Sequence, residues 1–319
     1  MVRTISVWLL AVCLRASAQE PTPEALIEAG HWKRARDLVE RRLREAPDDP
    51  NAVFLSSQVR NAFGDHNSPF GLAERAVRLD GSVARYHRQL AEAAGVMAQH
   101  ANPFQQLILA HRFRKEIDVA IMLDPGDTQA RRDLVEYYLL APGIAGGDVK
   151  KAELAARQLE AIDECAAALA KARIAEFRKD PAQQEAFLKS AAAARPPRYK
   201  AFMALAEFYM TRGGQSAAET VAQNALAIDP TRVGAYCVLA VIYAGRADWA
   251  ALDELLSKAE QSVPDDLAPY YSAGERLLAD GRDPARAVRY FRMYLSREPE
   301  GNQPSLDTAR SKLALARGR

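Results

Sequence analysis

The stretch "YKAFMALAEFYMTRGGQSAAETVAQNALAIDP", residues 199–230, has the pattern of two amphipathic helices joined by a turn. Its first half places four apolar side chains on one helical face, namely Phe202, Leu205, Ala206 and Tyr209. Its second half carries a stripe rich in alanine, namely Ala218, Val221, Ala222, Ala225 and Ile228. Small side chains at a contact allow two helix axes to approach closely. The stretch therefore predicts a helix hairpin whose two stripes pack against each other.

Short-range signals predict where both helices end. Gly213 and Gly214 supply the positive φ angle that commonly ends a helix. Ser216 followed by Glu219 has the spacing of a capping box, which predicts the start of the second helix. Pro230 ends that helix, because proline disfavours helical geometry in the residue before it. The unit is an antiparallel hairpin.

The same amphipathic run, closed by proline or glycine, recurs along the chain. The well-framed closing residues are Pro47, Gly81, Pro125, Pro196, Pro230, Pro264 and Pro299. Most of their intervals are 34 or 35 residues, one is 44, and one of 71 corresponds to two repeats whose middle closure is lost. A lone hairpin cannot bury its apolar stripe, so the repeats must stack on one another.

With this period the chain resembles the tetratricopeptide repeat family. The family's small and apolar positions match Leu205, Ala206, Tyr209, Ala218, Ala222, Ala225 and Pro230, and then Tyr236, Leu239, Ala240, Tyr243, Ala259 and Pro264. The match is looser between residues 48 and 196, where Pro69 is expected inside a disturbed second helix. The resemblance implies an all-α fold, a right-handed α-solenoid of stacked helix-turn-helix repeats.

The chain divides into three expected parts. Residues 1–18 have the features of a signal peptide, with an apolar run over 5–14 and small residues at Ala16 and Ala18. About seven to eight repeats are expected over 19–303, most regular at 199–299, and a capping helix over 304–319. We predict cleavage after Ala18 and export to the periplasm or secretion. Lipidation at Cys13 stays open.

The charge balance and the N-terminal run exclude two kinds of partner. Removing residues 1–18 takes away two of the 43 basic residues and none of the 41 acidic ones, so 41 face 41. Nucleic-acid binding normally needs a basic excess on one face, so no nucleic-acid partner is expected. The apolar run of ten residues is shorter than the ~20 that cross a bilayer, so no integral membrane span is expected after cleavage.

Catalytic and metal-binding motifs are missing from the sequence. It contains no H-E-x-x-H, C-x-x-C or G-x-S-x-G, and its five histidines are dispersed without metal-ligand spacing. We therefore expect no catalytic residue, no cofactor and no metal site. Cys165 and Cys237 lie about two repeats apart, beyond the ~7 Å between Cα atoms that a disulfide tolerates, so we expect no bond between them.

The glycine-rich segment Ala141–Gly147, with two lysines after it, is compared with a phosphate-binding loop. Such a loop follows a strand and ends in Gly-Lys-Ser/Thr. Here the preceding residues have helical spacing, and no Ser or Thr follows Lys150 or Lys151. We predict a structural turn between two helices. Any further role of this segment stays open.

The resemblance implies a concave groove, lined by the first helix of each repeat, that binds a protein or an extended peptide. The positions carried over are Phe54, Gln58, Asn61, Arg85, Arg88, Glu92, Arg132, Glu136, Lys200, Met203, Glu207, Met210, Tyr271 and Glu275. Arg85, Arg88 and Arg132 can hold an acidic peptide through charge-assisted hydrogen bonds. The alternative is that they pair with Glu92 and Glu136 one turn away on their own helices.

The sequence thus predicts a non-catalytic scaffold or adaptor of a bacterial-type cell envelope. Its expected binding anchors are Phe54, Met203, Met210 and Tyr271. The alternative is a periplasmic accessory to envelope transport or assembly that holds a ligand or substrate in the groove. A sealed apolar pocket near residues 95 to 150 would favour that alternative. The partner's identity and self-association stay open.

Overall fold

The computed structural model describes residues 21–65, 67–301 and 304–318, and this part of the chain contains helices and no strand. The first helices of eight hairpins are α1 (Pro23–Ala29), α3 (Pro50–Ala62), α5 (Ala84–Gln99), α7 (Thr128–Leu140), α9 (Glu164–Phe177), α11 (Tyr199–Thr211), α13 (Val233–Arg246) and α15 (Ala268–Ala279). The second helices are α2 (Trp32–Glu45), α4 (Ser68–Leu79), α6 (Pro103–Leu123), α8 (Val149–Glu160), α10 (Pro181–Ala193), α12 (Gln215–Ile228), α14 (Trp249–Ser262) and α16 (Pro284–Tyr294). A 3-10 turn, η1 (Gly143–Ala145), lies between α7 and α8, and α17 (Leu306–Arg317) packs on α16 as the capping helix.

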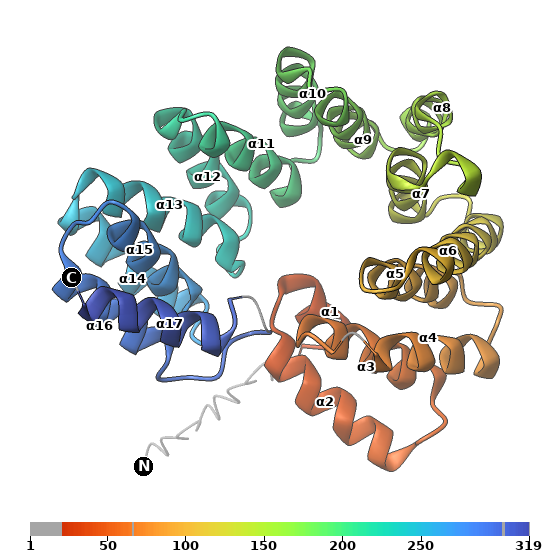
Figure 1. Ribbon diagram of the computed structural model, residues 1–319, viewed down its shortest axis with the longest axis horizontal. Coiled ribbons are helices and arrows are strands. Elements are labelled where there is room, and N and C mark those ends of the chain that lie inside the picture. Colours follow the sequence, from red (N-terminus) through yellow and green to blue (C-terminus); the bar gives the residue numbers. More distant parts are fainter. Residues whose placement is uncertain (1–20, 66, 302–303, 319) are drawn as a thin grey trace, which may run out of the picture.

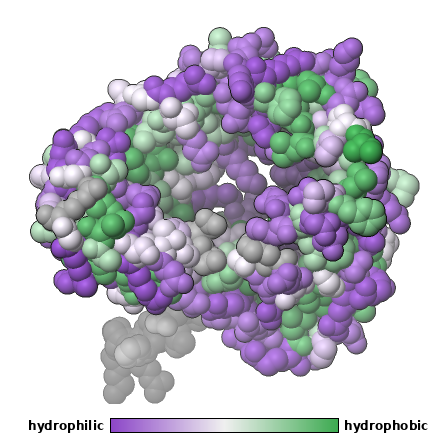
Figure 2. Space-filling model, viewed as in Figure 1, coloured by the Kyte–Doolittle hydropathy of each residue, from purple (hydrophilic) through white to green (hydrophobic). Residues whose placement is uncertain are grey.

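The hairpins follow one another round a ring, so that the last repeats return to the first (Figure 1). Helices α5, α7 and α9 face the middle of the ring, and α6, α8 and α10 lie outside them (Figure 1). Figure 2 shows that the middle is hollow and is edged mainly by hydrophilic residues. We call this space the central opening. The expected all-α solenoid of stacked hairpins with a capping helix is confirmed.

Aspartate side chains begin many of these helices. Each accepts a hydrogen bond from a backbone N–H in the first turn, which satisfies a donor that has no partner within the helix. The aspartates that do so at helix N-caps are Asp49, Asp127, Asp148, Asp163, Asp180, Asp248 and Asp283. This local chemistry explains why the connections between helices are short and well defined.

Two local predictions are wrong. Helix α12 begins at Gln215 after Gly214, so Ser216 lies inside the helix and forms no capping box. Gly214 N–H donates to the Tyr209 carbonyl, which closes the turn early, and Glu219 instead accepts from Arg246 of the next repeat. Pro69 lies in the first turn of α4 rather than inside it, where its missing N–H costs nothing.

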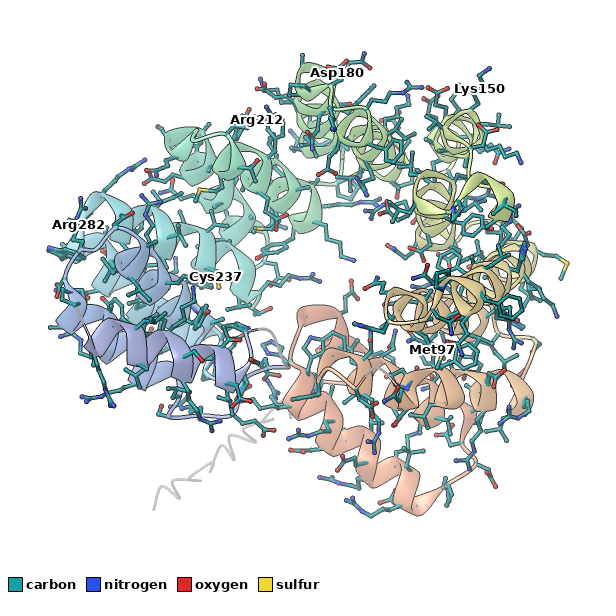
Figure 3. The ribbon with its side chains drawn as sticks, viewed as in Figure 1. Met97, Lys150, Asp180, Arg212, Cys237 and Arg282 are labelled. Atoms are coloured by element: carbon teal, nitrogen blue, oxygen red, sulfur yellow. The ribbon has the colours of Figure 1, made fainter. Side chains whose placement is uncertain are left out.

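The glycine-rich segment is a turn, as predicted. Helix α7 ends at Leu140, η1 follows, and Gly146 has a φ of 94°. A Cβ on Gly147 would lie 1.8 Å from the Ala141 carbonyl oxygen, so only glycine fits there. The Tyr137 hydroxyl donates to the Ala145 carbonyl and fastens the turn to α7. Lys150 lies at the outer edge of the ring, away from the central opening (Figure 3).

Polar contacts between the first and last repeats close the ring. The Lys33 backbone N–H donates to Glu300 Oε2 at 2.6 Å, and Lys33 Nζ donates to the carbonyls of Asp265 and Glu298 at 2.8 and 2.6 Å. The Arg36 guanidinium holds both carboxylate oxygens of Glu298, at 3.0 and 3.1 Å. A paired fork of this kind is directional as well as attractive. The seam, by which we mean the junction of the 28–36 segment with residues 265 and 298–301, is therefore a specific contact.

The two cysteines among the described residues are free thiols. Cys165 is buried in α9 and Cys237 is half-buried in α13, two repeats further along the solenoid. Burial raises the pKa of both thiols, and that of Cys237 to about 12. A protonated, buried thiol is a poor nucleophile and behaves as a small apolar side chain.

Candidate binding surface in the central opening

Three of the four predicted anchors are core residues. Phe54, Met203 and Tyr271 are 4%, 9% and 6% exposed, so they do not offer a surface to a partner. Phe54 lies against the Tyr86 ring, with 5.1 Å between centroids, and Tyr271 lies against Phe291 and Tyr294. The prediction that these three are binding anchors is wrong, because other helices cover the faces on which they lie: α5 of the next repeat covers Phe54, and α16 of the same repeat covers Tyr271.

The remaining predicted groove residues keep some exposure. Gln58 and Asn61 on α3, and Met210 on α11, are half-buried, whereas Glu92 and Glu207 are exposed. Glu275 on α15 pairs with Lys312 of the capping helix at 2.8 Å, so its charge is already matched. None of these residues alone marks a site.

The arginines of the groove pair between repeats and not along their own helices. Arg85 donates to Asn51 Oδ1 of α3 at 2.9 Å, and Arg88 Nε lies 3.3 Å from Asp127 at the start of α7. Glu136 on α7 takes both of its hydrogen bonds from Arg173 of α9, at 2.8 Å each. Pairing along the helix, the alternative suggested by the sequence, is therefore not what these three residues do.

Two cations of the groove have no such partner. Among the residues that the structure describes, Arg132 on α7 and Lys200 on α11 form no hydrogen bond and no ion pair through their side chains. Partial burial, followed by the positive charges of Arg132, Arg232 and Arg88, lowers the pKa of the Lys200 ammonium. The positive charge of Lys200 thus lies near other positive charges, and a bound anion would reduce the repulsion between them.

The cations near Lys200 come from different repeats and meet across the central opening. Arg88, Arg132, Lys200 and Arg232 come from four different repeats, and the charge of Glu28 on α1 also acts on Lys200. Arg232 Nη2 lies 3.7 Å from Glu28 Oε1, which joins the seventh repeat to the first. Groups from repeats so far apart in the sequence come together across the central opening, into which nitrogen-tipped side chains project (Figure 3).

One acidic residue of this region was not anticipated from the sequence. Burial raises the pKa of Asp133 to about 6, although a hydrogen bond from Gln129 and the charge of Arg88 oppose the shift. Gln129 Nε2 donates to Asp133 Oδ1 at 2.8 Å. No sequence signal marks Asp133, because its environment is created by neighbouring repeats.

The surface pockets lie elsewhere. A pocket of about 580 Å³ lies between α14 and α16, with Asp253 and Arg289 in its wall, and one of about 310 Å³ lies among α8, α9 and α10. A third, of about 350 Å³, is lined by Met97, Ile108 and Leu109. Ile108 is 55% exposed, so this last pocket is open to solvent. None of these three pockets is lined by Arg88, Arg132, Lys200 or Arg232.

A histidine–carboxylate pair in the interior has a structural geometry. His87 Nδ1 lies 2.6 Å from Glu116 Oε2, and its Nε2 lies 3.0 Å from the Gly81 carbonyl oxygen. Arg112 Nε holds the same carboxylate at 2.8 Å. Both ring nitrogens are engaged within the protein, so neither is free to take a proton from a substrate. The described residues also bring His31, Asp265 and Glu300 together at the seam, a set whose donor atoms suit a metal ion.

Comparison with known proteins supports the fold. No family model and no curated protein matches the chain. The crystal structure of yeast Tom70 matches with a TM-score of 0.59 at 14% identity, over 93% of this chain and 60% of that one. A tetratricopeptide repeat protein from Parabacteroides merdae matches with a TM-score of 0.44 at 12% identity, over 92% of this chain and 96% of that one. The likeness to Tom70 shows a tetratricopeptide-like fold, and the chain spans only part of that protein.

The helices also bear on membrane insertion. Within residues 21–65, 67–301 and 304–318, no helix combines the length and the apolar character that crossing a bilayer requires. The predicted signal peptide, residues 1–18, lies outside the described residues.

Proposed function

We propose that this protein is a non-catalytic interaction scaffold that binds an acidic, extended segment of a partner protein in the central opening. The observation that carries the proposal is the pair of cations, Arg132 and Lys200, that have no ion-pair partner and lie near two further arginines. Solenoids use the extended concave surface made by their stacked repeats for binding. An extended segment matches that surface because it can contact several repeats in turn.

The chemistry of the opening selects an acidic segment. Three of the four predicted apolar anchors, Phe54, Met203 and Tyr271, are buried, so the proposal relies on charge instead of apolar anchoring. Carboxylates accept charge-assisted hydrogen bonds from guanidinium and ammonium groups, and two cations close together hold a carboxylate better than one. The proposal thus keeps the arginine-based recognition anticipated from Arg88 and Arg132 and drops the apolar anchors.

The test is a fluorescence-anisotropy titration of the mature chain with a short labelled peptide rich in Asp and Glu. The double variant Arg132→Ala, Lys200→Ala is compared with Arg41→Ala, Lys258→Ala. The control pair removes the same charge from exposed positions on the second helices α2 and α14. Circular dichroism first establishes that all three proteins are equally helical.

The expected result is a loss of affinity of at least about tenfold, or about 1.4 kcal/mol, in the first variant only. Added salt should weaken binding to the unsubstituted chain, because exposed charges are screened. Equal binding by both variants would place the site outside the central opening. Equal affinity for a lysine-rich peptide of the same length would show that charge does not select the partner.

The competing function is that of a periplasmic accessory to envelope transport or assembly that holds a ligand or substrate in the groove. Its expected feature was a sealed apolar pocket near residues 95 to 150. The pocket beside Met97 and Ile108 is open to solvent, so no observation favours this function over the scaffold.

The cellular location is part of the proposal. The signal-like residues 1–18 support export from a bacterial-type cell, with cleavage after Ala18. Mass spectrometry of the protein recovered from a cell-envelope fraction should find Gln19 as the first residue. An intact N-terminus in the cytoplasmic fraction would contradict it, and a lipid mass on Cys13 would show anchoring instead.

A further inference from the structure

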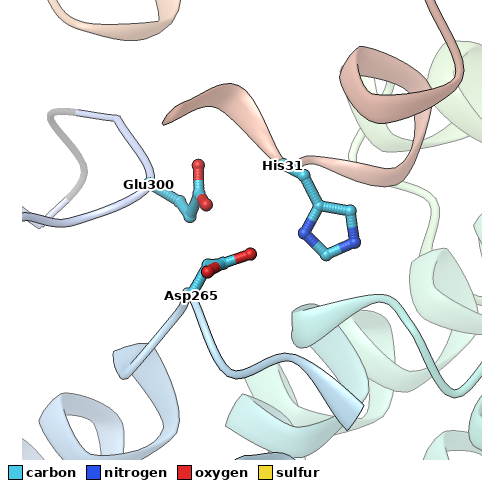
Figure 4. Close-up of side chains that lie close together, drawn as sticks. All are labelled: His31, Asp265 and Glu300. Carbon is cyan, nitrogen blue, oxygen red and sulfur yellow. The ribbon is translucent and has the colours of Figure 1, made fainter. Parts of the chain in front are cut away.

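Three loops that are far apart in the sequence meet at the seam. His31 lies between α1 and α2, Asp265 between α14 and α15, and Glu300 between α16 and α17. One donor atom from each lies within 4.8 Å of the others. Figure 4 shows the two carboxylates and the imidazole gathered round one small space. The set therefore joins the first repeat to the last two.

The imidazole of His31 is buried without a hydrogen bond. His31 is 8% exposed and directed toward the two carboxylates (Figure 4). It precedes α2 as its N-cap, yet its side chain forms no capping hydrogen bond, and no other described residue donates to it or accepts from it. The ring nitrogens of His31 therefore remain available to a ligand, whereas most buried polar groups in proteins are already paired.

The carboxylates also keep free oxygens. Glu300 Oε2 accepts from the Lys33 backbone N–H, whereas Glu300 Oε1 is buried and has no hydrogen-bond partner in the described structure. Asp265 Oδ2 lies 3.8 Å from Arg34, a distance too long for a hydrogen bond. Each of the three residues thus has an unused donor atom for a ligand placed between them.

We propose that His31, Asp265 and Glu300 bind a divalent transition-metal ion, zinc in the first instance, which fastens the two ends of the ring. One imidazole nitrogen and two carboxylate oxygens are ordinary zinc ligands, and a water molecule can complete a tetrahedron. Small side-chain rotations shorten the separations to those of a bound ion. A magnesium or calcium site would use oxygen ligands without the histidine.

The neighbouring charges are compatible with a cation. Lys33 uses its ammonium on the carbonyls of Asp265 and Glu298, not on the carboxylates of the site. Burial lowers the pKa of His31, which keeps it in the neutral form that binds metals.

The consequence is control over the shape of the ring. The ion would add a link to the polar contacts of the seam, between loops at opposite ends of the solenoid, and so would keep the ring closed around the central opening. This inference does not depend on what the opening binds. Its failure would leave the binding proposal untouched, because Arg132 and Lys200 are not part of the seam.

The test is isothermal titration calorimetry of the chelator-treated full chain with Zn²⁺. One ion per chain is expected. Both His31→Ala and Glu300→Gln should weaken binding by more than about 100-fold, beyond the loss expected for an outer-shell partner. His111→Ala, which removes an exposed histidine of α6, should bind as the unsubstituted chain does. The Glu300→Gln side chain keeps its acceptor for Lys33, so that variant should stay folded if His31→Ala does not.

A second measurement reports on the seam itself. Hydrogen exchange should slow in the 28–36 and 298–301 segments when Zn²⁺ is added, and not in His31→Ala. With Co²⁺ as the probe, visible absorption should develop in proportion to bound ion and be lost in Glu300→Gln. Zn²⁺ binding of equal strength in His31→Ala and in the unsubstituted chain, or no binding by the unsubstituted chain, would overturn the proposal.

Discussion

The two halves of the ring hold their repeats together in different ways. From α11 to α17 the buried side chains form one continuous cluster that runs from Met203 to Ala316. From α1 to α11 the core is divided among five smaller clusters, which contain Leu55, Leu90, Leu159, Cys165 and Leu188 respectively. Polar contacts such as Arg173 with Glu136, and Arg88 with Asp127, join neighbouring repeats in that half.

The difference follows from the spacing of the repeats. Where the period stays at 34 or 35 residues, each apolar stripe meets the next, and the core is continuous. The inserts before residue 196 change the stacking, as in the 21-residue helix α6, and leave gaps between apolar stripes. The less regular half carries Arg88 and Arg132, two of the cations of the central opening. Regular repeats thus give cohesion, and irregular ones give room for polar side chains.

The largest effect should come from breaking the continuous core. Phe291 is fully buried, with its ring centroid 5.6 Å from that of Tyr271, so Phe291→Ala should cost about 3–5 kcal/mol of unfolding free energy. The rate of hydrogen exchange should rise in all the helices of the continuous cluster, from α11 to α17. The matched change Leu159→Ala, in the divided half, should raise exchange only from α5 to α9, the helices of its own smaller cluster. A rise of equal extent in both variants would show that the two halves do not differ in cohesion.

The next largest effect is a pH dependence of the unfolding free energy, which arises in the half with the divided core. Because the folded pKa of Asp133, about 6, lies above its ordinary value, the folded chain binds more protons there than the unfolded chain between about pH 4 and 6. Its contribution to stability is therefore present at low pH and is lost as the pH rises through about 6. Relative to Asp133→Asn, the unfolding free energy of the protein should fall by up to about 3 kcal/mol from pH 4 to 7.

Chemical denaturation of both proteins at several pH values measures this difference. Arg88, Arg132 and Glu92 act on the same carboxyl, so the variant also changes their surroundings. The informative quantity is therefore how the difference in unfolding free energy between the two proteins changes with pH, and not its value at one pH. A difference that does not change between pH 4 and 7 would contradict the assigned environment of Asp133.

A smaller effect is expected at the turn between α7 and α8. Gly147→Ala places a Cβ against the Ala141 carbonyl oxygen and should cost roughly 1–3 kcal/mol. Gly143→Ala, where nothing lies within 4 Å of the added atom, is the control and should be nearly neutral. The melting temperatures of Gly147→Ala and Gly143→Ala, measured by thermal denaturation, test this prediction. Equal melting temperatures would mean that the segment is not a tightly packed turn.

The smallest effect should come from a single ion pair between repeats. Arg173 and Glu136 are 35% and 40% exposed, so water and salt screen them. Arg173→Gln should cost no more than about 1 kcal/mol. A double-mutant cycle with Glu136→Gln gives the coupling between the two residues. A coupling as large as the loss in Phe291→Ala would show that ion pairs, and not apolar clusters, dominate the cohesion of that half.

The sequence predicts the hairpins well and the site only in part. Apolar spacing and closing prolines fix a helix and its end locally, so the hairpin of residues 199–230 and the turn at 141–147 could be predicted. The buried positions of Phe54 and Tyr271 could not, because a repeat frame gives a residue's place on its helix but not which neighbour covers it. The closed ring, and the cluster of His31, Asp265 and Glu300 at the seam, depend on the accumulated curvature of eight repeats. No local pattern records that curvature.

The central claim is that a partner segment lies in the central opening, and photocrosslinking tests it most directly. An acidic peptide with a benzoyl-phenylalanine at its middle is irradiated with the mature chain, and the linked residues are identified by mass spectrometry. The account predicts crosslinks to α5, α7 and α11, the helices that carry Arg88, Arg132 and Lys200. Crosslinks confined to the second helices, or to the 141–147 turn, would contradict it.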